Sequence, residues 1–108
     1  MSISTHVLDA VAGRPAVAMT LRLERASGEP VGDGTTDHDG RCPELTAGLS
    51  LDTGSYRMVF DTGAWFARSG TPTFYPVVEL VFEVTDPAAH YHVPLLLSPF
   101  AFSTYRGS

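Results

Sequence analysis

The chain has 108 residues, a hydrophobic content of 44% and a formal net charge of −5, which fits one globular domain spanning 1–108. No stretch is rich in basic residues, so we expect no nucleic-acid partner. All seven basic residues are Arg, and the lack of Lys excludes a lysine Schiff base and a P-loop lysine.

Cysteine usage and the amino-terminal sequence bear on the compartment. Cys42 is the only cysteine, so no disulfide can form within the chain. The opening MSISTHVLDA has no basic start and no long apolar run, which predicts neither a signal peptide nor a membrane helix. We therefore expect a cytoplasmic protein that does not bind a membrane; a secreted protein without disulfides is the alternative.

Short alternating runs between Gly and Pro residues predict strands along most of the chain. The first run is 4–11, where Ser4, His6 and Leu8 share one face. The runs 19–24, 56–61 and 77–84 alternate in the same way, and Asp39-Gly40 predicts a tight turn.

The segment DTGAWFARSGTP differs, because a polar start, an Ala-containing centre and a Gly-Pro stop favour a short helix over about 62–69. We expect Trp65 and Phe66 on it to pack into the core. The last segment, 90–108, is interpreted as two strands around a Ser98-Pro99 turn. The sequence thus predicts an all-β, two-sheet sandwich of about eight strands with one short helix.

Two histidines lie two positions apart in the first of these last strands, so their side chains point the same way. His90 and His92, together with His6, could form a three-histidine metal site. No acidic residue shares the motif, and a His-x-His pair alone is a weak signal, so we expect no metal. His90 is interpreted as a surface residue in a turn.

His92 differs from His90 because of what lies across the predicted hairpin. If the hairpin is symmetric about Ser98-Pro99, His92 lies opposite Tyr105. Proline cannot donate to a strand ladder, so we expect the Pro94 nitrogen to face away from the hairpin partner. His92 would then form a non-hydrogen-bonded pair with Tyr105, in which side chains come close.

Other reactive side chains are explained by structure alone. Arg41 follows the tight turn and, on composition alone, is a solvated turn residue, while Asp37 and Asp39 are turn formers. Cys42 beside Arg41 could have a lowered pKa, although a core or loop thiol is the better interpretation. Ser108 has no GxSxG context, which argues against a serine hydrolase.

Four segments together resemble a known family. STHVLDAVAGRPA, TDHDGRC, YRMVFDTGAWFARSGTPTFYP and YHVPLLLSPFAFSTYRGS are similar, in this order, to segments of the transthyretin-like proteins, specifically the 5-hydroxyisourate hydrolases of purine catabolism. The YRGS ending is the most specific element. The family also contains hormone carriers, whose counterparts of His6, Arg41 and His92 are Lys, Glu and Thr. One departure is Phe100-Ala101-Phe102, where aromatic-Gly-Tyr is commoner.

The resemblance implies hydrolysis of 5-hydroxyisourate to 2-oxo-4-hydroxy-4-carboxy-5-ureidoimidazoline during urate degradation, without a cofactor. It implies a homotetramer with active sites in the cleft between paired dimers. Either His92 or His6 would activate water, and Arg41 would stabilise the oxyanion. The substrate-binding residues would be Tyr105, Arg106, Gly107 and Ser108, with Ser108 acting through its hydroxyl, its carboxylate or its size.

Two other functions compete with this one. A transthyretin-like carrier would bind an aromatic small molecule without turnover. A structural sandwich domain would have no site, and His6, Arg41, His92 and the carboxyl-terminal residues would lie scattered in space. The distances between these residues in the folded chain therefore distinguish the third possibility from the first two.

Overall fold

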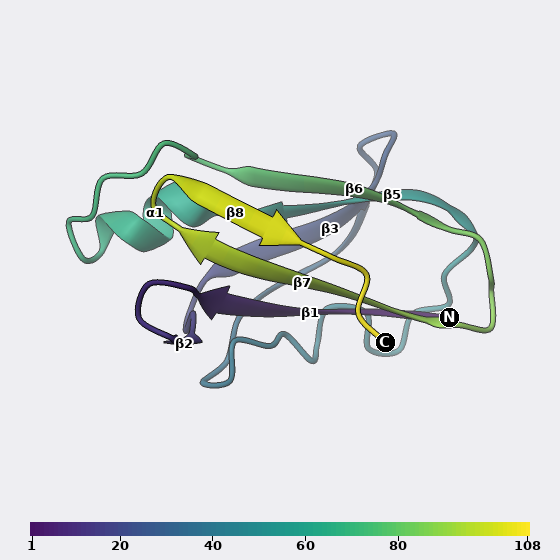
Figure 1. Ribbon diagram of the computed structural model, residues 1–108. Coiled ribbons are helices and arrows are strands. Elements are labelled where there is room, and N and C mark those ends of the chain that lie inside the picture. The colour runs from purple at the N-terminus through teal and green to yellow at the C-terminus, as the bar shows by residue number, and fades with distance from the viewer.

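The computed structural model describes residues 1–108, which form eight strands and one helix (Figure 1). The strands alternate with turns, and the helix follows the fifth strand. The elements are β1 (Ser2–Asp9), β2 (Arg14–Pro15), β3 (Thr20–Arg25), β4 (Pro30–Thr35), β5 (Gly54–Phe60), α1 (Thr62–Ala67), β6 (Val78–Val84), β7 (His90–Ser98) and β8 (Ala101–Thr104).

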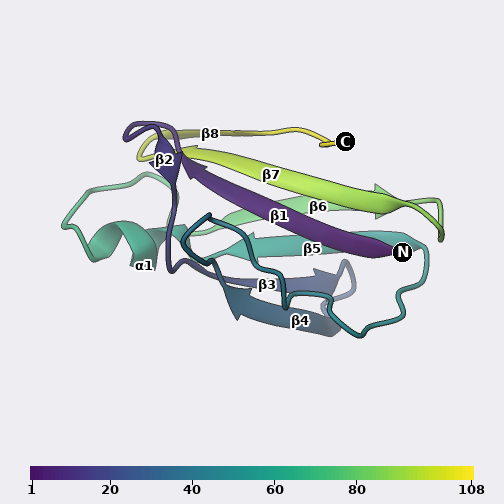
Figure 2. The ribbon, with the colours of Figure 1, turned by 90° about the horizontal axis from the view of Figure 1, so that it is seen from below.

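The strands build two four-stranded sheets, ordered β2-β1-β7-β8 and β4-β3-β5-β6. Figures 1 and 2 show the two sheets stacked as layers, with α1 beside one end. β1 and β7 pair in parallel, and the other neighbours pair antiparallel. The predicted two-sheet sandwich of about eight strands is confirmed.

The core lies between the sheets and follows the predicted alternation. Tyr56, Met58 and Phe60 of β5 are buried as predicted, and Val59, on the opposite face of the strand, is buried too. Burying such side chains stabilises the fold by about 1.5–3 kcal/mol each relative to exposure. The first strand is displaced from the predicted 4–11, because the Asp9 carboxylate accepts hydrogen bonds from the two N–H groups of 11–12 and starts a turn there.

The helix is present but shorter than the predicted 62–69. α1 ends at Ala67, and turns follow through Gly70, whose φ of +66° suits a residue without Cβ. Phe66 is buried in the core as predicted, whereas Trp65 is half-buried against the core and its indole donates a hydrogen bond to the Val17 carbonyl. No helix in the chain has the length and apolar character needed to cross a membrane.

The final hairpin has a different register from the predicted one. β7 pairs with β8 through Ser98↔Ala101 and Leu95↔Thr104, so the turn centres on Pro99 and Phe100. The prediction that Tyr105 lies opposite His92 is wrong: an isolated bridge joins His92 to Gly107. Moving the turn centre by one residue shifts every partner by two positions, which preserves the face that each side chain occupies.

The Pro94 nitrogen also points in the opposite direction from the one predicted. Its carbonyl accepts a hydrogen bond from the Thr104 hydroxyl, and the nitrogen of a strand residue points to the same side as its carbonyl. The Pro94 nitrogen therefore faces β8 and has no proton to donate. This explains why β8 ends at Thr104, and why Tyr105 and Arg106 leave the regular ladder before the bridge at Gly107.

Candidate functional site

The parallel pairing of β1 with β7 places the two predicted site histidines on one outer face of the first sheet. Register pairs Ser4 with His92 and His6 with Pro94. Side chains of one parity point the same way, and Thr5 and Val7 between them point into the core. His6 and His92 are half-buried. The sequence prediction that they share a face agrees with this arrangement.

Arg41 lies in the loop between β4 and β5, and this loop passes beside β1. The Val7 N–H donates to the Gly40 carbonyl at 2.8 Å, and an isolated bridge joins His6 to Arg41. A Cβ on Gly40 would lie 2.3 Å from the Val7 carbonyl oxygen, so only glycine lets the loop lie this close to β1. The backbone of Arg41 is therefore held beside that of His6, while its side chain is exposed, as expected of a turn residue.

Asp37 holds this loop in shape, as the turn prediction expected. Its carboxylate accepts hydrogen bonds from the N–H groups of Arg41 and Asp39 at 3.0 and 2.9 Å. These hydrogen bonds, with the one to Arg41 contributing most, lower the pKa of the Asp37 carboxyl below its usual value. The carboxylate thus fixes the backbone that presents Arg41.

The carboxyl-terminal segment 105–108 lies against His92. After β8 the chain bends back over β7, and its end lies over the amino-terminal half of β1 (Figure 1). The Gly107 N–H donates to the His92 carbonyl at 2.8 Å. A Cβ on Gly107 would lie 2.5 Å from the His92 Cδ2 atom, so this contact requires glycine. Tyr105 and Ser108 are exposed.

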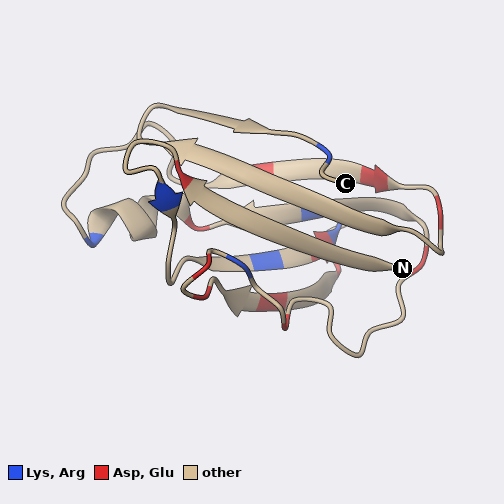
Figure 3. Ribbon diagram, turned by 60° about the horizontal axis from the view of Figure 1, so that its bottom comes forward, with Lys and Arg blue, Asp and Glu red and all other residues tan.

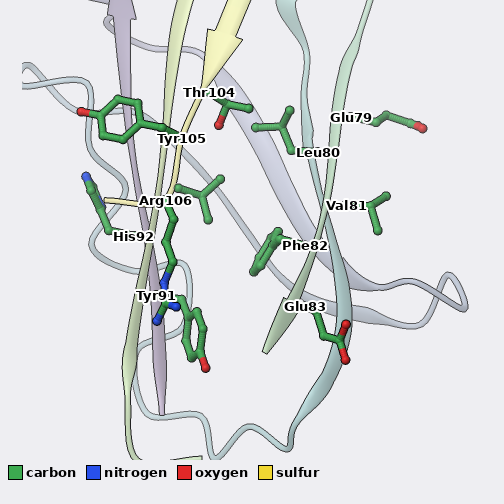
Figure 4. Close-up of a pocket in the computed structure, with 11 residues that line it drawn as sticks. Glu79, Leu80, Val81, Phe82, Glu83, Tyr91, His92, Thr104, Tyr105 and Arg106 are labelled. Carbon is green, nitrogen blue, oxygen red and sulfur yellow. The ribbon is translucent and has the colours of Figure 1, made fainter. Parts of the chain in front are cut away.

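A cavity of about 340 Å³ opens between this segment and β6 (Figure 4). Its lining includes His92, Tyr105 and Arg106 on one side and β6 side chains such as Phe82 on the other. The Arg106 guanidinium lies 4.6 Å from the centre of the Tyr91 ring, a cation–π distance. In this chain Arg106 thus points to the sheet edge, whereas His6 and Arg41 lie on the sheet face.

Few fixed charges surround the histidines. Figure 3 shows that the ribbons of β1 and β7 carry no charged residue except Asp9. The pKa of His92 is lowered from its usual value, first by burial and then by the charges of Arg41, His6 and His90. A neutral imidazole beside a fixed guanidinium can accept a proton from water while an anion forms nearby.

The sequence interpretation missed Ser4, and it was wrong to assign His90 to a turn. His90 is the first residue of β7, and its two ring nitrogens lie at hydrogen-bond distance from the hydroxyls of Ser2 and Ser4. The Ser4 hydroxyl also lies 2.7 Å from Nδ1 of His92. A single serine in a strand matches no sequence motif. The sequence features that could have indicated a role for Ser4 are that it shares a strand face with His6 and that the chain contains the His90-x-His92 pair.

Two alternatives that the sequence raised, a reactive Cys42 and a three-histidine metal site, can be compared with the structure. Cys42 is buried, and burial, together with Glu44, raises the pKa of its thiol to about 12, so it is a neutral core thiol. Potential metal-ligating atoms come together at Asp37, His38 and Asp39, an exposed turn, rather than at the three histidines. Exposed acidic groups of this kind are common without an ion.

Comparison with known proteins shows which family the chain matches. Residues 3–107 match the model of the HIUase/Transthyretin family. A 5-hydroxyisourate hydrolase from Mus musculus is 41% identical over 98% of this chain and 94% of its own length.

Two solved structures share the fold. The 5-hydroxyisourate hydrolase of Klebsiella pneumoniae is 38% identical, with a TM-score of 0.87 over 98% of this chain and 92% of that one. Sea bream transthyretin in complex with thyroxine is 34% identical, with a TM-score of 0.88 over 97% of this chain and 93% of that one. The matches thus include both 5-hydroxyisourate hydrolases and a transthyretin in complex with thyroxine.

Proposed function

Because the chain belongs to the HIUase/transthyretin family and is an enzyme of its hydrolase branch, we propose that it hydrolyses 5-hydroxyisourate to 2-oxo-4-hydroxy-4-carboxy-5-ureidoimidazoline. One observation carries the proposal. His6 from β1 and His92 from β7 share one sheet face, the backbone of Arg41 pairs with that of His6, and the backbone of Gly107 pairs with that of His92. A structural domain without a site would have no reason to gather them.

The proposed reaction adds water across a ring C–N bond. Nε2 of His92 takes a proton from water as the water oxygen attacks the carbonyl carbon, and the carbonyl oxygen becomes negative. Arg41 stabilises this oxyanion through its forked N–H groups. The C–N bond then breaks, and the ring nitrogen receives the proton from His92. His6 orients the water or donates a proton.

His92 is the better candidate for the base than His6. Its Nδ1 is held by Ser4, its Nε2 has no hydrogen-bond partner within the chain, and its pKa is lowered. The ring of His6 makes no hydrogen bond within the chain. As part of the same proposal, Tyr105, Gly107 and Ser108 would close the site around the substrate, and Arg106 would join them by moving from the Tyr91 ring, against which it lies in this structure. We also propose a cytoplasmic homotetramer, with the sites between paired dimers.

The direct test is a spectrophotometric assay on freshly made 5-hydroxyisourate. The protein is expected to accelerate the loss of substrate absorbance well above the spontaneous rate in the same buffer. A decay no faster than the blank would contradict the proposal. Binding of thyroxine without any such acceleration would support the carrier function instead.

Gly107→Ala is expected to lower turnover about a hundredfold, because a new Cβ 2.5 Å from the His92 ring must displace the ring or the segment, and misplacement of about 1 Å has that cost. The backbone at Gly107 does not need glycine for its φ, so crowding is the only cause. The measurement is kcat, with circular dichroism as the check on folding.

Gly48→Ala is the control for Gly107→Ala, since a Cβ there meets nothing within 4 Å although φ is +74°. The control is expected to lose some stability and to keep its turnover. Equal kcat for Gly107→Ala and the unmodified protein would show that close packing of the segment on His92 does not matter for turnover.

A further inference from the structure

Four polar side chains form a continuous row along the outer face of β1 and β7. The Ser2 hydroxyl lies 2.5 Å from Nδ1 of His90, and the Ser4 hydroxyl lies 2.8 Å from Nε2 of the same ring. Ser4 also lies 2.7 Å from Nδ1 of His92. One serine oxygen thus connects an exposed histidine to the half-buried histidine of the candidate site.

The number of protons in this row restricts how it can be bonded. A serine hydroxyl has one proton to donate, and each neutral imidazole has one N–H donor and one bare acceptor. Ser4 can therefore donate to only one of its two ring partners and must accept from the other. Either Ser4 donates to His90 and accepts from Nδ1–H of His92, or the two directions are reversed.

The two arrangements leave opposite groups at the free nitrogen of His92. In the first, Nε2 is a bare acceptor; in the second, it carries the proton and cannot act as a base. The other titratable or charged groups around His92 are His6 on β1, Arg41 on its loop, and Tyr105 and Arg106 in the carboxyl-terminal segment. Arg41 has donors only, so it favours a lone pair on the neighbouring ring over an N–H.

We propose that Ser4 and His90 are positioning residues that hold the proton of His92 on Nδ1 and leave Nε2 bare. His90 accepts the Ser4 proton at its Nε2, which prevents Ser4 from donating to His92. The Nδ1–H of His90 then donates to Ser2, so each of the three contacts in the row has one donor and one acceptor. During turnover the water proton enters and leaves at Nε2 of His92, and the row transfers none.

This role rests on the proposed hydrolysis, but its spectroscopic signature does not. Histidine ¹⁵N spectra of the whole ligand-free protein distinguish a protonated Nδ1 from a protonated Nε2. At a pH where the His92 ring is neutral, the unmodified protein is expected to carry the His92 proton on Nδ1. Ser4→Ala is expected to lose this preference and to lower kcat about tenfold to a hundredfold, with little change in KM.

Two more variants make the test specific. Ser4→Thr keeps the hydroxyl and is expected to restore kcat to within about threefold of the unmodified protein. His90→Phe keeps a ring but removes the acceptor for the Ser4 proton, so it should shift the His92 proton toward Nε2. Because both act through one hydrogen-bonded row, His90→Phe is expected to have no further effect on kcat in the Ser4→Ala background.

Ser55→Ala, an exposed serine on β5 of the other sheet, is the matched control and should keep both the tautomer and kcat. The inference is overturned if Ser4→Ala leaves His92 protonated on Nδ1 with unchanged kcat, or if the effects of Ser4→Ala and His90→Phe simply add. If the unmodified protein does not hydrolyse 5-hydroxyisourate, the proposed function fails, and the ¹⁵N spectra still decide whether Ser4 and His90 set the tautomer.

Discussion

Replacing His92 with Asn is expected to lower the kcat for 5-hydroxyisourate about a thousandfold, within the range that a general base contributes. The amide of Asn can occupy the place of Nδ1 beside Ser4, but it has no group that accepts a proton near neutral pH. The ring is half-buried and adds little to the core, so folding should be kept. The measurement is the decay of substrate absorbance on freshly made 5-hydroxyisourate.

His38→Asn is the matched control, since His38 is exposed in the 37–40 turn, where its Nε2 lies 3.5 Å from the Asp39 carboxylate. It should keep full turnover. Circular dichroism and size-exclusion chromatography should give the same fold and oligomeric state for both variants. Turnover by His92→Asn near that of the unmodified protein would rule out His92 as the base and leave His6 as the remaining histidine on that face.

Much of the fold could be predicted from periodicity. Alternation in 56–60 and in the run ending at Val84 matches the buried faces of β5 and β6, because side chains of one parity must share a face of a sheet. The hairpin register could not be obtained in this way. Turns centred on either side of Pro99 bury the same side chains, so the hydrophobic pattern does not distinguish them.

The candidate site was predictable only where residues form recognisable segments. His6, Arg41 and His92 came from the family resemblance, and the structure brings them together through the parallel β1–β7 pair and the close approach of Gly40. Ser4 was missed because its role depends on which strand lies beside β1. That neighbour is β7, more than 80 positions away along the sequence, and a strand pattern does not specify its partner.

Arg41→Gln is expected to have the second largest effect, for two separable reasons. Loss of the cation that faces the oxyanion should lower kcat about a hundredfold to a thousandfold, as for other oxyanion donors. The charge of Arg41 also lowers the pKa of His92, so its removal should raise that pKa. The acidic limb of kcat/KM against pH, where His92 becomes protonated, should then move to higher pH.

Arg41→Lys separates the two effects, because Lys keeps the positive charge but lacks the planar fork. It should leave the acidic limb near that of the unmodified protein and still lower kcat. Arg22→Gln, an exposed position on β3 of the other sheet, is the control and should change neither quantity. If Arg41→Gln lowers kcat without moving the acidic limb, then either Arg41 does not set the charge state of His92 or His92 is not the group that titrates in turnover. The His92→Asn variant distinguishes these two explanations. If it has lost turnover, His92 is the base that titrates, and Arg41 does not set its charge state.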